Sequence, residues 1–441
     1  MPRFTIIVPY FVGTITDDTL VEGMQALADS SFRDFEVRLY HDGPESRPLP
    51  ALPDGLDLHY LDNAATSHKP GCVIDAVSDC YRSQYGPVHR GLYRLAEQAT
   101  EAYERARARV AALVGATPAQ LVFTRSTTES INLVAQGWVR QRLRIGDEIW
   151  VSAMEHHANY LPWQVLCKNT GAVLKVIGLD RQGRLDLNAA KGLFGTRCRL
   201  IALSHVSNVL GTVNPVSTII QHAQAAGIPV LIDGAQAAGH LPVDIAALGC
   251  DFYAFSAHKM YGPTGIGALV ARPDRLEEME PLIYGGGMVD LVGNIHSQWM
   301  PAPAKFEGGS PNLAGALGFA AAAEFAETEC MGAAEDHVTN LVDMTLAGLD
   351  ALEGVQIYGP HDASERAGIV SFNLEGIHPH DVAQVAAEHD VALRAGHHCC
   401  QPLMSVLGEP ATVRASFTPY NLPADVEALL TSVKAAQTMF G

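Results

Sequence analysis

From Tyr60 onward, short apolar segments alternate with longer helical stretches, and this alternation limits the possible folds more than any other feature of the sequence. The clearest apolar segments are LVFT (121–124), EIWVSA (148–153), RLIALSHV (199–206), PVLIDG (229–234) and DFYAFSA (251–257). Strands that are apolar almost throughout are typical of a mostly parallel sheet that helices cover on both faces. The sequence therefore predicts an α/β fold built on such a sheet.

The two ends of the chain are organised differently from its middle. Residues 1–45 predict a β-α-β segment, with a helix at Asp18–Asp29 between strands at Phe4–Pro9 and Phe35–Tyr40. We expect a linker at residues 46–57. This range overlaps the proline-rich run GPESRPLPALPDG (43–55). A large domain is predicted at 58–325. Residues 326–441 predict a smaller α/β domain with the strand IVSFNL, the helix HDVAQVAAEH and the strand VALRAG.

Charge and composition exclude several classes of protein. Thirty lysines and arginines against 48 aspartates and glutamates give a net charge of −18, which repels phosphate backbones and argues against nucleic acid binding. The longest apolar run, Leu313 to Ala323, is too short to cross a membrane. The first residues lack a basic leader with a cleavage site, and the eight cysteines show no disulfide spacing. We therefore expect a soluble cytoplasmic enzyme with reduced thiols.

Lys259 lies in SAHKMYGPTGIG, directly after the apolar strand DFYAFSA. A buried lysine has a lowered pKa and can act as a nucleophile, but the local sequence equally allows a surface lysine. Asp233 closes the strand PVLIDG, and Gln236 follows it closely. Such a carboxylate can keep the ring nitrogen of pyridoxal phosphate protonated, and Gln236 can bond the ring oxygen. Asp233 could instead be a helix N-cap, but ligands gather at the carboxyl ends of strands in such sheets, which favours the cofactor site.

A phosphate site is indicated where the strand LVFT runs into the helix ESINLVAQGWV. Thr127 and Thr128 place two hydroxyls and free backbone N–H groups at the helix N-terminus, which suits a dianion. Taken alone, this segment is more commonly only a helix cap. GPTGIG (262–267) is neither a GxGxxG fingerprint nor a P-loop, so no nucleotide is expected.

Two histidine-containing segments also follow predicted strands. His156 and His157 come after EIWVSA, where an imidazole can stack on a cofactor ring, although a histidine that only bonds the strand end is no less common. Cys399 and Cys400 follow two histidines in RAGHHCCQP. Adjacent side chains point to opposite sides and no second cysteine pair is present, so no metal site is predicted. With Arg394 nearby, a cysteine here can instead act as a thiolate.

Taken in order along the chain, these segments resemble one family. The motifs are YLDNAATSHKP, VHRGLYRLAEQAT, STTESINLVA, MEHHANYLPW, SHVSNVLGTVNP, DGAQAAGHLPVD, SAHKMYGPTGIG, FEGGSPN and RAGHHCCQP. Together they are similar to the SufS-type (group II) cysteine desulfurases, which have the class V aminotransferase fold, from about Leu58 to the C-terminus. The resemblance implies a fold-type I pyridoxal phosphate enzyme with a mostly parallel seven-stranded sheet and a small C-terminal domain. It also implies a homodimer with active sites at the subunit interface.

The resemblance implies roles for the cofactor-binding residues. Lys259 matches the catalytic lysine that binds pyridoxal 5'-phosphate, and Asp233 matches the partner of the pyridine nitrogen. Gln236 matches the contact to the ring oxygen, and His156 matches the catalytic residue that stacks on the ring. The matches to the phosphate contacts are Thr127, Thr128, Ser256, His258 and Ser310, the last of them from the other subunit.

The resemblance also implies the substrate residues and the reaction. Arg414 and Asn208 match the contacts to the substrate carboxylate, while Arg394 and His89 match positions beside the nucleophile, His89 coming from the partner chain. Cys399 matches the sulfur-accepting cysteine. The implied activity converts L-cysteine to L-alanine and passes a persulfide to an acceptor of the SufE or SufU kind for iron–sulfur cluster assembly. The alternatives are a selenocysteine lyase on the same scaffold and a binding protein whose N-terminal segment recruits a partner.

Three features depart from the family's pattern. Cys400 stands where a small or polar residue is expected, so a second thiol could accept sulfur or oxidise. Ser126 replaces the usual glycine before the threonine pair. FTIIVPYFVG and SFRDFEVRLYHDGP resemble the first β-α-β unit of family 2 glycosyltransferases. The segment lacks that family's metal-binding carboxylate pair and is too short for a working transferase, so we interpret it as a remnant or a docking element.

Overall fold

The computed structural model describes residues 4–10, 35–41, 58–190 and 192–441, which fall into two compact units, residues 1–49 and 50–441. In the first unit, β1 (Phe4–Tyr10) and β2 (Phe35–His41) pair in parallel. Both strands are expected from the sequence, and each extends one residue further. The helix predicted at Asp18–Asp29 and the linker predicted at 46–57 lie outside the described residues.

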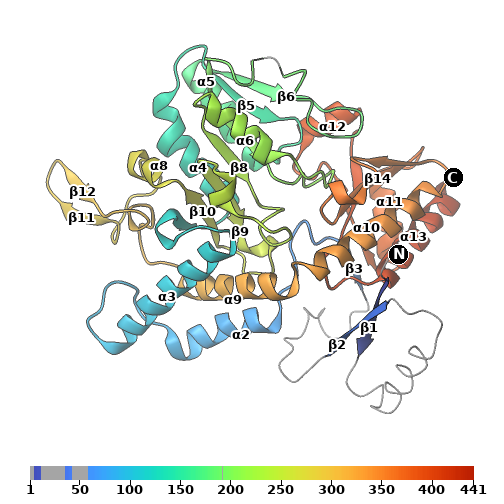
Figure 1. Cartoon of the computed structure of the whole chain (residues 1–441), viewed down its shortest axis with the longest axis horizontal. Coiled ribbons are helices and arrows are strands. Elements are labelled where there is room, and N and C mark those ends of the chain that lie inside the picture. Colours follow the sequence, from blue (N-terminus) through green and yellow to red (C-terminus); the bar gives the residue numbers. More distant parts are fainter. Residues whose placement is uncertain (1–3, 11–34, 42–57, 191) are drawn as a thin grey trace. The chain divides into compact units, whose positions relative to one another are not determined.

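A seven-stranded sheet forms the centre of the second unit (Figure 1). In order across the sheet, its strands are β4 (Leu121–Thr124), β10 (Gly267–Ala271), β9 (Phe252–Ser256), β8 (Val230–Asp233), β7 (Cys198–Ser204), β5 (Glu148–Ser152) and β6 (Val173–Ile177). β10 is antiparallel to both of its neighbours, whereas the pairs from β9 to β6 are parallel. This is the mostly parallel seven-stranded α/β sheet that we expected. The carboxyl ends of β4, β5, β7, β8 and β9 lie along one edge.

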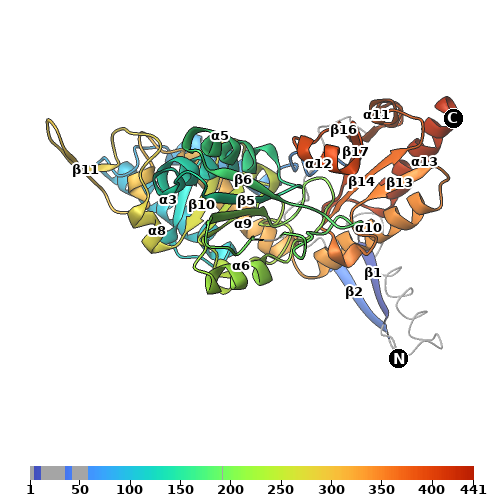
Figure 2. The same ribbon diagram turned by 90° about the horizontal axis from the view of Figure 1, so that it is seen from above.

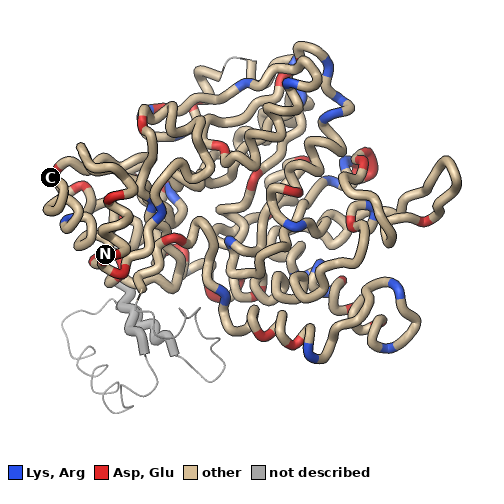
Figure 3. The backbone as a smooth tube through the Cα atoms, turned by 180° about the vertical axis from the view of Figure 1, so that it is seen from behind, with Lys and Arg blue, Asp and Glu red and all other residues tan. Residues whose placement is uncertain are grey.

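Helices surround this sheet. They are α2 (Gly71–Asp79), α3 (Arg94–Leu113), α4 (Thr127–Val134), α5 (Leu161–Thr170), α6 (Val216–Ala225), α7 (Ile245–Leu248), α8 (Pro273–Glu278) and α9 (Leu313–Glu329). Between α8 and α9, β11 (Val289–Val292) and β12 (Ser297–Trp299) form an antiparallel hairpin. Among the described helices, none is both long and apolar enough to span a membrane. Acidic and basic residues are interspersed along the described backbone (Figure 3).

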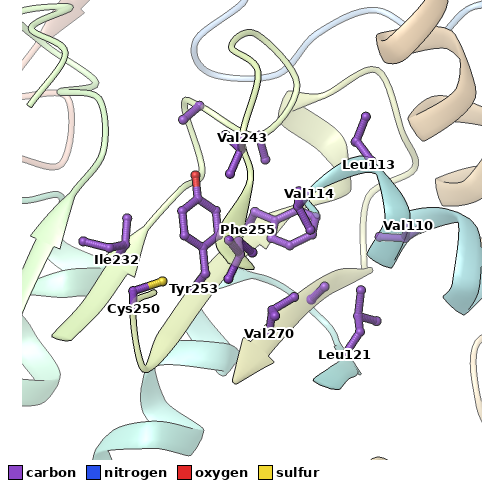
Figure 4. Packing of buried hydrophobic residues seen from close by; sticks show 14 of the residues in the cluster. Val110, Leu113, Val114, Leu121, Ile232, Val243, Cys250, Tyr253, Phe255 and Val270 are labelled. Carbon is purple, nitrogen blue, oxygen red and sulfur yellow. The ribbon is translucent and has the colours of Figure 1, made fainter. Parts of the chain in front are cut away.

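Alternate residues of each central strand enter two different cores, which explains why these strands are apolar throughout. From β9, Tyr253 and Phe255 pack with side chains of α3, α6 and α9. Phe252 and Ala254 of the same strand pack with side chains of α4 and α5. All four residues are fully buried. Figure 2 shows α5 and α6 on opposite sides of the sheet, and Figure 4 shows Tyr253 and Phe255 within the first core. A polar side chain at any of these positions would have to enter a core, at a cost in stability.

The last part of the second unit contains a smaller sheet. Its antiparallel strands, in order, are β13 (Val355–Tyr358), β14 (Ile369–Leu374), β17 (Thr412–Ser416) and β16 (Arg394–Gly396). The helices that follow α9 are α10 (Ala333–Asp350), α11 (Pro379–Glu388), α12 (Gln401–Leu407) and α13 (Pro423–Phe440). α10, α11 and α13 share a separate apolar core with β14 and β17. The predicted strand IVSFNL and helix HDVAQVAAEH correspond to β14 and α11. The division at residue 325 and the limits of the other predicted domains stay predictions.

The predicted strand VALRAG is two strands in the structure. β15 (Val391–Ala392) pairs in parallel with β3 (His59–Tyr60), whereas β16 pairs with β17. The chain passes from one sheet to the other at Leu393. This crossing brings the segment that follows β3 next to the strands that carry Arg394 and Arg414.

Candidate active site

Lys259 and Asp233 lie at the ends of neighbouring parallel strands. β8 ends at Asp233. β9 ends at Ser256, and the short 3₁₀ turn that follows it (Ala257–Lys259) carries the lysine. Asp233 is buried, and its carboxylate accepts a hydrogen bond from the Ala235 N–H (3.0 Å). Burial lowers the pKa of Lys259 and raises that of Asp233, and the charge of each residue partly offsets the shift of the other. The lysine and the carboxylate are therefore close enough to act on each other.

The turn that carries Lys259 is fastened to the segment before α2. The His258 carbonyl accepts hydrogen bonds from the Ser67 N–H, the Thr66 hydroxyl and the Lys69 amine, each at 3.1 Å. Burial, followed by the charge of Lys259, lowers the pKa of the His258 imidazole to about 4. The ring is therefore neutral at physiological pH and can offer one N–H as a donor.

Helix α4 begins beside the end of β9. The Thr127 N–H donates to the Ser256 Oγ (2.7 Å), and the two hydroxyl oxygens are also 2.7 Å apart. Both residues are buried, whereas Thr128 is exposed. Ser126 caps the helix by accepting the Glu129 N–H (3.3 Å). The segment is thus a helix cap, and it also places several hydroxyls at a helix N-terminus.

A serine in place of glycine at position 126 suits the local backbone. Ser126 is extended (φ −175°, ψ 168°), a conformation that any residue adopts. Glycine is required instead at Gly267, where a Cβ would lie 2.8 Å from the Cα of Ser126. The end of the GPTGIG segment therefore allows β10 to approach the turn before α4.

His156 and Gln236 lie on the segments that follow β5 and β8. The Nδ1 of His156 accepts the Ala158 N–H (3.0 Å), which fixes the ring's orientation. Burial, and next the charge of Lys259, lower the pKa of His156 to about 3, so the imidazole is neutral at physiological pH. Gln236 is buried, and its Nε2 donates to the Ala64 carbonyl (2.8 Å). The same amide has a second N–H for another acceptor.

A buried carboxylate that we did not select from the sequence supports the His156 turn. Glu155 accepts hydrogen bonds from the Ser152 hydroxyl (2.5 Å), the Asn159 amide (2.6 Å) and the Ser204 N–H (3.0 Å). Ser152 and Ser204 are the last residues of β5 and β7. Burial raises the pKa of Glu155 to about 7, although these hydrogen bonds oppose the shift. Glu155 therefore joins two strand ends to the turn that carries His156.

Hydrogen bonds fasten the Cys399 loop to the turn after β5. The His157 N–H donates to the Cys399 carbonyl (2.7 Å), and the Gln401 N–H donates to the His157 Nε2 (3.2 Å). The Asn208 amide donates to the His398 carbonyl (2.8 Å). His398 and Cys399 both have left-handed backbones (φ 52° and 54°), which are uncommon for residues with a side chain. These bonds hold an unusual turn that leaves Cys399 exposed.

Cys399 and Cys400 differ in exposure and in contacts. Cys400 is fully buried, its thiol donates to the Glu155 carbonyl (3.1 Å), and burial raises its pKa. A buried thiol with a raised pKa is a poor nucleophile and resists oxidation. By contrast, Cys399 is exposed, and its carbonyl accepts a hydrogen bond from the turn that follows β5. Of the two thiols, only Cys399 is placed for chemistry at this site.

Arg414 and Arg394 lie opposite each other on β17 and β16 and share one carboxylate. The Nη2 of Arg414 donates to Asp62 (3.1 Å), and Arg394 donates to the same carboxylate from Nε and Nη2 (3.1 and 3.0 Å). Arg414 also donates to the Asn208 carbonyl (2.8 Å). Arg414 is buried, and its Nε has no hydrogen-bond partner among the described residues. Asp62 was missed in the sequence, although an acidic residue directly after a short strand in YLDNAATSHKP was a usable signal.

His89 and Ser310 are exposed, and within the described chain neither is bonded to Lys259 or Cys399. The His89 Nε2 lies 3.2 Å from the Glu104 carboxylate on α3, and Ser310 follows Glu307 in the FEGGSPN loop. Buried Arg107, which the sequence reasoning also missed, joins the two segments. It donates to Glu307 (2.6 and 2.9 Å) and to Glu104 (2.9 Å).

A lysine and a carboxylate at the ends of adjacent parallel strands, beside hydroxyls at a helix N-terminus, define a class of α/β enzymes in which ligands bind at strand ends. Residues 59–429 match the aminotransferase class-V family. The chain is 46% identical over 389 residues to a probable cysteine desulfurase of Halalkalibacterium halodurans, covering 88% of this chain and 95% of that protein. It is 44% identical over 390 residues to a cysteine desulfurase of Escherichia coli, with the same coverage of both chains.

Solved structures agree with these relatives. The cysteine desulfurase CsdA of Escherichia coli, in its S-sulfonic acid form, aligns with a TM-score of 0.81 and 41% identity, over 87% of this chain and 96% of that one. The apo cysteine desulfurase of Thermococcus onnurineus aligns with a TM-score of 0.84 and 40% identity, over 87% and 95%. The chain therefore belongs to the class V aminotransferase family and, within it, to the cysteine desulfurases. Its sheet is that of fold-type I enzymes.

The residues at the site fit pyridoxal 5'-phosphate. Asp233 is a buried carboxyl group at a strand end, and the cofactor's pyridinium nitrogen is the kind of cation that its ionised form stabilises. The hydroxyls of Thr127 and Ser256 at the start of α4 suit a phosphate group. The buried Nε of Arg414 has no hydrogen-bond partner among the described residues and is a donor of the kind that carboxylates accept from.

Proposed function

We propose that this protein is a SufS-type (group II) cysteine desulfurase that uses pyridoxal 5'-phosphate and carries the sulfur of L-cysteine as a persulfide on Cys399. The observation that carries the proposal is the exposed Cys399 loop. It is hydrogen-bonded to the turn that contains His156, through the Cys399 carbonyl and the Gln401 N–H. A plain aminotransferase would not need a cysteine at this position.

Each residue at the strand ends has a defined task toward the cofactor. When bound, pyridoxal phosphate supplies a ring that withdraws electrons from the substrate carbon. Lys259 would hold it covalently, and its amine, once free, would move a proton at that carbon. Asp233 would keep the ring nitrogen protonated, neutral His156 would stack on the ring, and Gln236 would bond the ring oxygen. The residues for the phosphate are Thr127, Thr128, Ser256 and His258, with Ser310 of the second subunit.

The remaining residues bind the substrate and take its sulfur. Arg414 binds the carboxylate through its free N–H groups, with Asn208 and Arg394 beside it. The Cys399 thiolate attacks the substrate sulfur, and its electron pair forms the new sulfur–sulfur bond. The carbon–sulfur bond breaks, and its electron pair remains with the carbon, which is then protonated to give L-alanine. His89 of the second subunit lies beside the nucleophile.

Product analysis tests this function. Purified protein loaded with pyridoxal phosphate is given L-cysteine and a thiol reductant, and alanine and sulfide are measured together. We expect equal amounts of the two products. Pyruvate and ammonia in place of alanine would indicate β-elimination and would contradict sulfur transfer through Cys399.

Cys400→Ala is expected to keep most of the activity and to lower stability modestly, because one hydrogen bond worth about 1 kcal/mol is lost. After reaction with L-cysteine, peptide mass spectrometry should find one extra sulfur in this variant, as in the wild type. The matched variant Cys399→Ala should carry none. Extra sulfur on Cys400 in Cys399→Ala would show that the buried thiol does accept sulfur.

We further propose that the protein is a homodimer in which each site takes His89 and Ser310 from the partner subunit. Large apolar side chains are exposed at positions between His89 and Ser310 in the sequence, among them Leu92, Tyr284 and Ile295, and such side chains commonly mark an interface.

Mixed dimers test this arrangement. If Lys259→Ala and His89→Ala are each inactive alone, a mixed dimer of the two variants has one intact site of two. About half of the dimers in an equal mixture of chains are mixed, so the mixture should regain roughly a quarter of the wild-type activity. Subunits are co-expressed with different affinity tags, and the activity of the mixture is compared with that of each variant. No regain in a confirmed mixed dimer would mean that one chain supplies both residues.

We also propose that the protein acts in the cytoplasm and passes its sulfur to an acceptor of the SufE or SufU kind for iron–sulfur cluster assembly.

For the domain organisation, we propose that the segment at 1–45 is a glycosyltransferase-like remnant or a docking element joined by a linker at 46–57. A large cofactor domain (58–325) and a small domain with the cysteine loop (326–441) follow. Deletion of residues 1–50 should leave desulfuration unchanged, and a pull-down with the acceptor shows whether the segment serves docking.

A further inference from the structure

The Asp62 carboxylate lies between the two arginines that the proposed function assigns to the substrate. Arg394 donates to it from two nitrogens, and Arg414 donates from one. The Asp62 side chain is 16% exposed, that of Arg414 only 3% and that of Arg394 48%. One carboxylate thus serves a buried and an exposed arginine at the same time.

The backbone around Asp62 is bonded to β17, so the carboxylate is not a mobile surface group. The Ala64 N–H donates to the Ser416 hydroxyl (2.9 Å), and the Asn63 amide donates to the Ser416 carbonyl (2.8 Å). Asp62 itself forms a β-bridge with Ser416. Arg414 lies two residues before Ser416 on the same strand, so the carboxylate and the guanidinium are held on adjoining backbones.

The charges at this point balance only in part. Two arginines and one aspartate leave a net charge of +1, which is the charge that a single substrate carboxylate neutralises. Arg414 has five N–H donors, and the described contacts use two of its nitrogens while the Nε lacks a partner. Burial lowers the pKa of Arg414 and the Asp62 charge opposes that shift, as expected of a counter-ion.

We propose that Asp62 is a positioning residue that acts as an internal carboxylate. It orients Arg394 and Arg414 for the substrate carboxylate, and it limits this pair of arginines to one net positive charge. The arginine pair then keeps one net positive charge, which matches a single carboxylate and attracts an anion less strongly than two unpaired arginines would. This inference rests on the proposed function, because that function assigns the two arginines to the substrate.

Asp62→Asn removes the charge and keeps the shape of the side chain. In the protein loaded with pyridoxal phosphate, we expect a lower melting temperature than in the wild type, because the two arginines lose their shared counter-ion. The inhibition constant for acetate should be about tenfold lower, because an added anion replaces the missing charge. Sodium acetate should also raise the melting temperature of this variant by more than that of the wild type. Ionic strength is held constant with the salt of a bulky sulfonate buffer.

A matched control separates this effect from the general loss of an ion pair. Glu365 makes a two-point contact with Arg184 (2.6 and 2.8 Å) away from the site. Glu365→Gln should leave the acetate inhibition constant and the acetate-dependent rise in melting temperature as in the wild type. An equal acetate effect in both variants, or none in Asp62→Asn, would overturn the inference.

Two further variants keep the test decisive if Asp62→Asn folds poorly. Asp62→Glu retains the charge and should stay close to the wild type in its response to acetate. The double variant Asp62→Asn with Arg394→Gln restores a net charge of +1, so its melting temperature should again respond little to acetate. A strong acetate response in either variant would contradict the charge balance that we infer.

Failure of the inference is distinguishable from failure of the proposed function. Arg414→Gln should raise the KM for L-cysteine strongly if this arginine binds the substrate carboxylate. A raised KM together with an unchanged acetate response in Asp62→Asn overturns only the role of Asp62. An unchanged KM in Arg414→Gln overturns the assignment of the arginine itself.

Discussion

Cys399→Ala is expected to lower the rate of L-cysteine desulfuration by at least about 10³-fold, because the thiolate that takes the substrate sulfur is removed. Binding of pyridoxal phosphate should be unchanged, since Cys399 is exposed and the hydrogen bonds that hold the loop use its backbone groups and not the Cys399 side chain. The rate is measured as alanine formed from L-cysteine, and cofactor content is measured from the absorbance of the purified variant.

The neighbouring thiol supplies a control for Cys399→Ala. Cys400→Ala removes a sulfur one residue away, but that sulfur is buried and bonded to the Glu155 carbonyl. Turnover of L-selenocysteine should survive in Cys399→Ala, because selenium leaves more readily than sulfur and needs no thiolate to accept it. Cysteine desulfuration that persists in Cys399→Ala would mean that another group is the nucleophile.

Lys259→Ala is expected to abolish turnover, with a loss of at least about 10³-fold, because the amine both holds the cofactor and moves the proton. When the wild-type protein loaded with pyridoxal phosphate is reduced with borohydride, the cofactor mass should appear on the peptide that contains Lys259. In Lys259→Ala, the cofactor should be lost on dialysis.

A second lysine close to the same turn makes this test specific. Lys69 donates to the His258 carbonyl (3.1 Å), and burial lowers its pKa to about 8. On pKa alone, Lys69 is also a competent amine nucleophile. Lys69→Met should nevertheless keep the cofactor on Lys259, because the Asp233 charge acts on Lys259. Cofactor mass on the Lys69 peptide would show that the wrong lysine was chosen.

The sequence predicted the main strands because their signal is local. LVFT matches β4 residue for residue, and IVSFNL matches β14. A buried strand between two helical layers needs apolar residues on both faces, and such a run is recognisable without knowledge of its neighbours. VALRAG was harder, because its division into β15 and β16 depends on which sheets each half joins.

Site residues could be predicted where they lie at strand ends. Asp233 ends β8, Ser256 ends β9 and Lys259 follows one turn later, so the strand order alone gathers them at one edge of the sheet. Asp62, Glu155 and Arg107 escaped this reasoning. Decisive partners of Asp62 and Arg107 are distant in the sequence, and the burial of Glu155 cannot be recognised locally; only Asp62, directly after a short strand, had a local signal.

The sequence by itself determined the α/β class of this protein, its main strands and the residues that follow them, since periodicity and strand ends are properties of short segments. Only the tertiary structure decided which contacts those residues make. It exposed Cys399 and buried Cys400, and it joined Asp62 to Arg414 across 352 residues of chain. The physical reason is that side-chain direction and ion pairing depend on how separate strands lie against one another, which no short segment specifies.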